Sequence, residues 1–343
     1  MTAQDDVGYH ARQQARWRLS EVAFWVLVLA CALLFPSRYL IMTDILRLAL
    51  FALSLDLILG YAGVVSLGHA AFFGIGAYSA GLLALHGIVP EPVLALFVAG
   101  LIATVVGFLT SFLVIRGVDL TRLMVTLGIA LLLEALAERF SNITGGSDGL
   151  QGIEMQPILG LFAFDMFGKV GFFYCLTVLF ILFLLARRIV HSPFGLSLRA
   201  IRNNPLRAAA IGIPVNRRLI AIYTLSAFYA GIAGALFTQT TALASLDVFS
   251  FEKSADLMLV LVIGGTGYLY GGLIGAVVFK MLQEIFQTIT PQYWLFWIGL
   301  VLVVIVLVGR PRMHRWALWL PNLVIRRFAG RKAVVAVPER DGP

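Results

Sequence analysis

The chain of 343 residues is 60% hydrophobic and only 13% charged, and its mean hydropathy is +0.92. Soluble domains carry about 25% charged residues, so this composition excludes a soluble globular protein and predicts an integral membrane protein. The net charge of +8 falls in loops and tails between apolar segments. It therefore reports membrane topology before any affinity for nucleic acid.

The apolar runs predict helices rather than the strands of a barrel. Residues 22–35 and 94–115 lack the alternation of polar and apolar side chains that a spanning strand needs. Each crossing takes about 20 apolar residues, so the chain predicts an all-α polytopic bundle of about 8–10 transmembrane helices. In chain order the spans are expected at 22–41, 44–62, 66–85, 94–115, 121–138, 171–186 and 219–240, with three more segments in 255–309.

Charge asymmetry between the loops predicts which side of the membrane each one faces. Arg12, Arg16 and Arg18 precede the first span, and the loop 187–218 is also rich in arginine. The positive-inside rule places both on the cytoplasmic side. The acidic intervals 139–170 and 241–256 are expected outside. Ten crossings satisfy this pattern, and eight also do if part of the apolar region is re-entrant.

This topology predicts a single membrane domain with two polar ends. The expected parts are a cytoplasmic amino-terminal segment at 1–21, a transmembrane domain at 22–309 and a basic cytoplasmic tail at 310–343.

Motifs for enzyme chemistry are missing from the sequence. It has neither the glycine-rich phosphate loop of an ATPase nor the H-E-x-x-H pattern of a metalloprotease. The two cysteines, Cys31 and Cys175, lie within apolar spans and are expected to pack as small hydrophobic side chains. We therefore expect a protein that is not an enzyme, with no bound cofactor or metal and no ATP site of its own.

The loop 187–218 contains seven arginines and no acidic residue. Pro193, Phe194 and Gly195 indicate a turn, and a short helix is predicted from Leu196 to Asn203. A second helix is predicted from Pro205 to about Ile211, before the stop signal of Gly212 and Pro214. Positive-inside bias alone would supply arginines to a loop, but it does not predict two ordered helices. The pattern indicates a structured segment on which another protein docks.

Polar and small residues inside the apolar segments allow two interpretations. Asp56, His69 and Glu134 could form hydrogen bonds between helices, or they could line a translocation path, since ionisable groups within a membrane commonly mark pathways. Lys280 and Glu284 lie one helical turn apart and can pair. The candidates for path lining or packing are Asp56, Gly63, Ser66, His69, Gly74, Glu134, Gly264, Gly265 and Gly267.

Small residues also recur every four positions on two of the expected helices. Gly267, Gly271 and Gly275 form one series, and Ala227, Gly231 and Ala235 form another. Such ridges let helices approach closely in lipid, so close packing is their first interpretation. Unwound backbone at membrane depth must be buried in protein or face water, so the glycine-rich break at 264–272 favours a functional role.

Four segments in order carry a resemblance to a known family. They are residues 56–83 (DLILGYAGVVSLGHAAFFGIGAYSAGLL), 145–150 (GGSDGL), 198–213 (LRAIRNNPLRAAAIGI) and 261–276 (LVIGGTGYLYGGLIGA). Over about residues 45–309 the chain resembles the permease subunit, M-type, of the branched-chain amino acid ABC transporters.

The resemblance implies a type II ABC importer fold in the inner membrane of a bacterium, with both termini cytoplasmic. It implies as partners two cytoplasmic ATPase subunits that bind the ATP, a second homologous permease and a periplasmic substrate-binding protein. Asn203 and Pro205 stand where relatives usually carry acidic residues. The residues that match the ATPase coupling segment are Phe194, Gly195, Leu198, Arg199, Ala200, Ile201, Arg202, Asn203, Arg207, Ala208 and Gly212.

The function that the resemblance implies is the import of leucine, isoleucine and valine delivered by the binding protein. Members of the family also move urea, short amides or other amino acids, so these substrates stay open. A different class, an ion-coupled secondary transporter, would require a coupling carboxylate such as Asp56 or Glu134. An intramembrane enzyme is disfavoured because no catalytic cluster is present.

Overall fold

The computed structural model describes residues 19–117, 119–165 and 167–308. Within these ranges the chain is helical with no extended strand, which confirms the predicted all-α membrane bundle. The expectations for residues 1–18 and for the basic tail at 310–343 fall outside the described residues. The chain divides into two compact units, Met1–Met281 and Leu282–Pro343.

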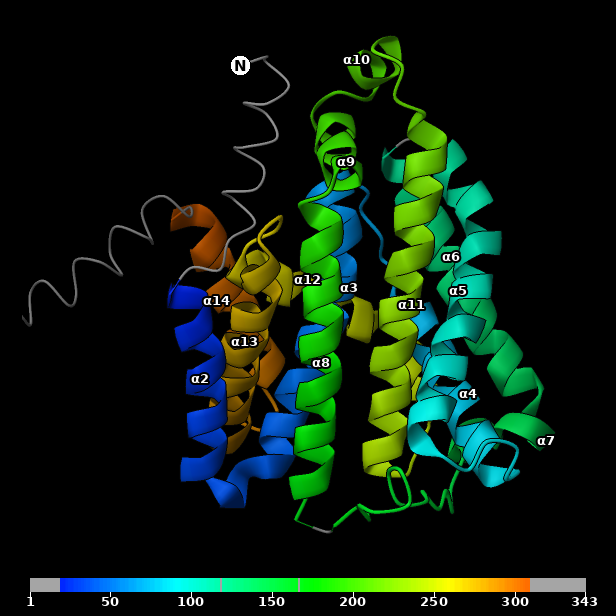
Figure 1. The fold of residues 1–343 in the computed structure, drawn as a ribbon, viewed down its shortest axis with the longest axis vertical. Helices are drawn as coiled ribbons and strands as arrows, with labels where there is room; N and C mark the ends of the chain where they lie inside the picture. The colour runs from blue at the N-terminus through cyan, green and yellow to red at the C-terminus, as the bar shows by residue number, and fades with distance from the viewer. Residues whose placement is uncertain (1–18, 118, 166, 309–343) are drawn as a thin grey trace, which may run out of the picture. The chain divides into compact units, whose positions relative to one another are not determined.

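Thirteen α-helices and three short 3-10 turns make up the described residues (Figure 1). The helices are α2 (Leu19–Leu34), α3 (Tyr39–Ala62), α4 (Ala70–Leu85), α5 (Pro92–Arg116), α6 (Asp119–Arg139), α7 (Ser141–Thr144), α8 (Lys169–Val190), α9 (Pro193–Asn203), α10 (Pro205–Ala210), α11 (Val215–Thr241), α12 (Phe251–Gly264), α13 (Leu269–Ile289) and α14 (Trp294–Val308). The turns are η1 (Pro36–Arg38), η2 (Gly146–Asp148) and η3 (Leu246–Phe249).

The predicted spans match these helices except near two breaks. The span expected at 22–41 ends too late, because Pro36 starts the turn η1 and α3 begins only at Tyr39. The span expected at 66–85 begins too early. Gly63 ends α3 with a φ of +74°, and the chain stays irregular until Ala70. The apolar region 255–309 forms three helices as predicted.

The helices differ in whether they are long enough to cross a membrane. Six described helices have the length and hydropathy of a span, and α2, α4 and α14 are shorter apolar helices. The 14 residues of α12 cover only about 21 Å at 1.5 Å per residue, less than the roughly 30 Å of a hydrocarbon core. Helix length therefore leaves the choice between eight and ten crossings open.

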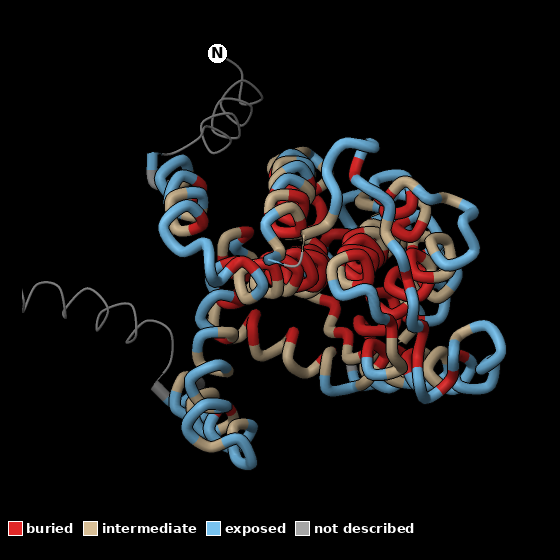
Figure 2. The backbone as a smooth tube through the Cα atoms, turned by 90° about the horizontal axis from the view of Figure 1, so that it is seen from below, coloured by how far each residue is buried: buried red, intermediate tan, exposed pale blue. Residues whose placement is uncertain are grey.

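Helices α3 and α11 form the centre of the first unit. Both are buried over most of their length, whereas α6 is largely exposed. Buried positions accordingly gather on the middle helices of Figure 2 and exposed ones lie around the outside. The predicted small-residue ridge on α11 is confirmed as a packing surface. A Cβ added at Gly234 would collide with the Phe73 carbonyl on α4, and one added at Gly76 on α4 would collide with the Gly231 backbone.

The first unit has two distinct ends. Helices α9 and α10 lie at one end, and α7 with the segment up to residue 165 lies at the other (Figure 1). There Leu150 and Ala244 exchange backbone hydrogen bonds of 2.8 and 3.3 Å. Gly145, Gly146 and Gly149 all have positive φ, so the GGSDGL motif is the turn that makes this contact. The α5 to α6 connection lies at the α9 end, because α6 runs from it to α7.

Helix α2 is held to α8 by charge and by aromatic packing. Arg187 forms an ion pair and hydrogen bond with Glu21. Trp25 packs edge-on against Phe180 and Phe183, with ring centroids 4.9 and 5.4 Å apart. In the second unit, Phe286 on α13 stacks on Trp297 of α14 at 6.2 Å.

The close approach of α4 and α11 predicts a marked difference between two glycines. Gly76→Val should destabilise the protein by about 1–3 kcal/mol or more, because the added atoms meet backbone that cannot move aside. Gly128→Val on α6 is the matched control, since a Cβ there has no neighbour within 4 Å. Thermal unfolding of the purified variants in detergent measures the difference. Equal melting temperatures for the two variants would contradict the packing described above.

Candidate functional site

The basic loop folds as two capped helices, as the sequence predicted, but α9 begins earlier than expected. Pro193 occupies the first turn of α9, where its missing N–H is not needed, so residues 193–195 are helix and not a separate turn. Ser192 caps α9 by accepting a hydrogen bond from the Gly195 N–H, and Asn204 caps α10 by accepting one from Arg207 N–H at 2.9 Å. Gly212, with a φ of +87°, follows α10.

One face of α9 packs on the membrane helices. Leu198 and Ile201 are buried at 1% and 4% exposure. A Cβ at Gly195 would collide with the Val190 carbonyl at the end of α8, so glycine is needed for this approach. The guanidinium of Arg218 lies 5.2 Å from the ring centre of Phe194. Helix α9 is thus a fixed extension of the bundle.

Two arginines of α9 reach the end of α3. The Arg202 guanidinium donates to the Gly60 carbonyl, and the Arg199 guanidinium stacks over the Tyr61 ring at 5.5 Å. The last turn of an α-helix has carbonyls without helical partners, and cations are favoured there by the helix dipole. Arg202 therefore supplies a hydrogen-bond donor to the end of α3, and both arginines supply positive charge there.

The glycine-rich break between α12 and α13 also contacts the last part of α3. Its Gly267 N–H donates to Asp56 Oδ1 at 2.7 Å, and Asp56 is fully buried on α3. Gly265 and Gly267 have φ of +106° and +81°, which residues with a side chain rarely adopt. A Cβ at Gly267 would lie 2.8 Å from Arg202 Nη1. The loop helix, the end of α3 and the break thus form one network.

We call Asp56, Gly60, Tyr61, Arg199, Arg202 and Gly267 the loop network. It joins three segments that lie far apart in the sequence through hydrogen bonds and one cation–π contact. A displacement of α9 would pull on the end of α3 and on the α12 to α13 break together. The arrangement is suited to transmitting movement, and none of its groups is placed as a nucleophile beside a base.

A second buried polar group surrounds His69. Its Nε2 lies 2.9 Å from Ser54 Oγ and 3.2 Å from Ser226 Oγ, and Ser226 donates to the Ser54 carbonyl at 2.6 Å. The next residue, Ala70, donates its N–H to Ser254 Oγ at 3.0 Å. These bonds tie the start of α4 to α3, α11 and α12. The interpretation of His69 as an interhelical hydrogen-bonding residue fits this geometry.

The remaining sequence candidates are spread over the bundle. Ser66 is fully buried in the irregular segment before α4, and a Cβ at Gly74 would collide with the Phe249 ring. Gly63 ends α3 beside Arg202. Glu134 lies half-buried on α6 and takes no part in the loop network or the His69 group. Gly264 packs against the Gly271 backbone.

Sequence reasoning missed several partners of the predicted residues. Gly60 and Tyr61 lie inside the 56–83 motif, but nothing in their spacing indicated that α9 would reach them. Ser54 and Ser226 looked like ordinary small polar residues. No group of three or more metal-binding side chains occurs within the described ranges.

Fold and site together define a class: a membrane-embedded transport protein in which a structured loop is tied to the ends of the membrane helices. The family follows from comparison with known proteins. Residues 38–306 match the family described as the branched-chain amino acid transport system permease component. The chain therefore belongs to this family of ABC transporter permeases, as its motifs predicted.

Individual relatives are more distant. The high-affinity branched-chain amino acid transport system permease protein LivM of Escherichia coli is 27% identical over 77% of this chain and 66% of its own length. The chain thus spans just under two thirds of that relative. The ribose import permease protein RbsC of Bacillus subtilis is 31% identical over 46% of this chain and 53% of its own length.

The autoinducer 2 import system permease protein LsrD of Escherichia coli is 27% identical over 80% of this chain and 83% of its own length. Permeases named for sugars or signalling molecules are therefore also among the relatives. No solved structure matches the chain.

The bond between Asp56 and Gly267 makes a testable prediction. Asp56→Ala should cost about 1.5–3 kcal/mol, the range for a hydrogen bond to a charged group, and should speed amide hydrogen exchange at residues 264–268. Asp56→Asn keeps an acceptor oxygen and should lose less. Hydrogen exchange with mass spectrometry on the detergent-solubilised protein measures both. Unchanged exchange at 264–268 in Asp56→Ala would show that the break does not depend on this carboxylate.

Proposed function

We propose that this protein is a permease subunit of an ATP-driven importer that carries leucine, isoleucine and valine across the inner membrane. Substrate would arrive on a periplasmic binding protein, and energy would come from partner ATPases. Family membership and the similarity to LivM over 77% of the chain support this choice.

The observation that carries the proposal is the loop network. In an importer driven by separate ATPases, a permease must convert movement at its docking segment into movement of its membrane helices. Arg202 and Arg199 connect α9 to the end of α3, and Gly267 connects the α12 to α13 break to the same helix. This is a direct mechanical route from the loop to two helix ends.

The outer surface of the loop suits a protein partner. Leu206 and Ile211 are 82% and 71% exposed, and Arg207 lies exposed beside them on α10. An apolar contact flanked by cationic side chains fits a partner groove with acidic groups, where charge complementarity orients the encounter. We assign this surface to an ATPase subunit, and we assign ATP binding to that partner because the sequence has no phosphate loop. A second permease would complete the membrane part.

Orientation in the membrane follows from the charges at the two ends. The α9 end carries the arginine-rich loop and the α5 to α6 connection, whereas Asp148, Glu154 and Asp165 lie in the segment at the opposite end. The positive-inside rule supports a cytoplasmic position for the loop and for both termini, with the acidic segment in the periplasm facing the binding protein.

An ion-coupled carrier is the competing class, and the geometry of Asp56 argues against it. Its carboxylate accepts the Gly267 N–H and helps to hold a backbone break in place, which is a structural duty. Uptake into proteoliposomes decides between the classes. ATP-dependent uptake of labelled leucine that requires the ATPases and the binding protein supports our proposal, and uptake driven by an ion gradient without ATPases rejects it. Uptake of labelled ribose and of labelled urea, measured in parallel, tests whether these compounds are substrates instead.

Charge reversal in the loop should uncouple transport. The triple variant Arg199→Glu, Arg202→Glu, Arg207→Glu should insert normally and lose at least about tenfold in substrate-stimulated ATP hydrolysis and uptake, because it breaks the loop network at Arg199 and Arg202 and reverses the charge that orients docking at Arg207. The single variant Arg207→Glu leaves the loop network intact and should show a partial loss. Both activities are measured in proteoliposomes containing the full complex.

The control for the single variant Arg207→Glu is Arg139→Glu, which makes the same charge change on an exposed residue at the opposite end of the bundle. It should leave stimulated ATP hydrolysis unchanged. Full transport by the triple variant would mean that the ATPases dock elsewhere.

A further inference from the structure

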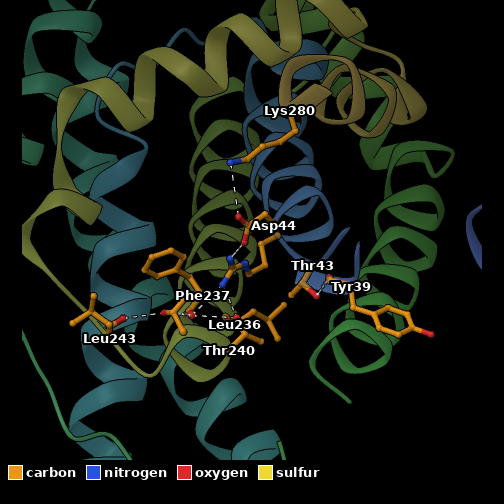
Figure 3. Close-up of polar contacts among 10 residues, drawn as sticks. Tyr39, Thr43, Asp44, Leu236, Phe237, Thr240, Leu243 and Lys280 are labelled. Carbon is orange, nitrogen blue, oxygen red and sulfur yellow. Dashed lines mark hydrogen bonds and ion pairs between the residues drawn. The ribbon is translucent and has the colours of Figure 1, made fainter. Parts of the chain in front are cut away.

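A group of charged side chains lies within the membrane helices, away from the loop network. Asp44 and Arg47 belong to α3 and Lys280 belongs to α13 (Figure 3). Asp44 is the ninth residue of the apolar span Pro36–Ala62, about 12 Å from its start. Lys280 is nine residues before the end of α13, or about 13 Å. Both charges therefore lie well inside the apolar region.

Arg47 is fixed in this group by α11. Its guanidinium donates to Thr240 Oγ1 at 2.5 Å and to the Phe237 carbonyl at 3.3 Å, and it lies 4.9 Å from the centre of the Phe237 ring. It also pairs with Asp44 Oδ1. Only 8% of the Arg47 side chain is exposed. Arg47 thus holds one oxygen of Asp44 in place.

The other oxygen of Asp44 has a looser contact. Lys280 Nζ lies 3.9 Å from Asp44 Oδ2, about 1 Å longer than a direct hydrogen bond between an ammonium and a carboxylate. The Asp44 side chain is 42% exposed and that of Lys280 is 27% exposed. Figure 3 shows the two side chains extending toward each other from separate helices. The length of this one contact leaves the two groups without a direct hydrogen bond to each other.

Charges of both signs lie near this contact. Asp256 on α12 interacts electrostatically with Lys280, and also with Lys253, Glu252 and Asp247. Exposed charges at this depth are costly against lipid and are expected to face water or protein. A site that offers one carboxylate and one ammonium group side by side suits a molecule that itself carries one positive and one negative group better than it suits a simple anion or cation.

We propose that Asp44 and Lys280 form a binding station for the zwitterionic head group of an α-amino acid on its way through the bundle. The substrate carboxylate accepts hydrogen bonds from Lys280 Nζ, and its ammonium group donates to Asp44 Oδ2. Arg47 is a positioning residue that keeps Asp44 in place. The inference rests on the proposed transport of amino acids. A neutral sugar would gain nothing from either charge.

The first test compares uptake of labelled leucine by the complete transporter in proteoliposomes. Lys280→Met should lower the uptake rate at limiting substrate at least tenfold, whereas Lys280→Arg should retain most of it. Asp44→Asn should resemble Lys280→Met. Lys169→Met is the matched control, because Lys169 is exposed at the start of α8, and its uptake should stay unchanged.

The outcomes separate this inference from the proposed function. Leucine uptake by the unmodified complex together with normal uptake by Lys280→Met overturns the station alone. Equal losses in Lys280→Arg and Lys280→Met also overturn it, because the charge would not matter. Absence of amino-acid uptake by the unmodified complex overturns the proposed function, and the station with it. If Asp44→Asn fails to fold, the comparison of Lys280→Met with Lys280→Arg still tests the binding station.

A second test measures whether Lys280 faces water in the assembled transporter. In a background of Cys31→Ser and Cys175→Ser, Lys280→Cys should react with a water-soluble methanethiosulfonate reagent, and loaded binding protein should slow the reaction. Leu273→Cys on the same helix is the control, because Leu273 is 3% exposed and should not react. An unreactive Lys280→Cys would place this residue against lipid or a partner subunit and would overturn the station.

Discussion

The structure depends on one constraint: backbone groups freed by a break in a membrane helix must find partners inside the protein. Helix α12 ends at Gly264 and α13 starts at Leu269, so the chain between them needs donors and acceptors from elsewhere. Asp56 accepts the Gly267 N–H, and Arg202 donates to the neighbouring Gly60 carbonyl. Because Arg202 comes from the basic loop, the α12 to α13 break and helix α9 are both bonded to the last two turns of α3. In a permease whose docking segment must act on its membrane helices, the same helix, α3, can connect the loop to the break.

Buried polar residues serve two different purposes in this bundle. The contacts of Asp56 and of the His69 group join polar atoms to backbone atoms or small hydroxyls at 2.6–3.2 Å, so they fix helices against one another. Around Lys280 the contact with Asp44 is longer and both side chains are partly exposed. Short hydrogen bonds suit transmission of movement, whereas a longer charge pair suits the ligand proposed above. The two regions also lie at different depths, which separates coupling from substrate handling.

Much of this fold could be predicted from the sequence, because helix length and hydropathy dominate in a membrane. The three segments after residue 255 and the two loop helices follow from Gly and Pro positions. The ends at Pro36 and Ala70 were misjudged because apolar composition continues through both breaks. Asp56, His69 and Gly267 were recognised as unusual, but their partners were not, since contacts such as Arg202 with Gly60 span 142 residues. The possible pairing of Lys280 with Glu284 was a local inference, and Asp44, 236 residues away, could be found as a partner only in the fold.

The ion pair between Glu21 and Arg187 has a consequence for biosynthesis. Glu21 lies in the first turn of α2, and its partner follows 166 residues later at the end of α8. A chain is made from its amino terminus, so α2 leaves the ribosome long before Arg187 exists. The ion pair and the packing of Trp25 on Phe180 and Phe183 can form only after α8 has been made. The contact between the first described helix and the bundle therefore depends on a segment from the middle of the chain.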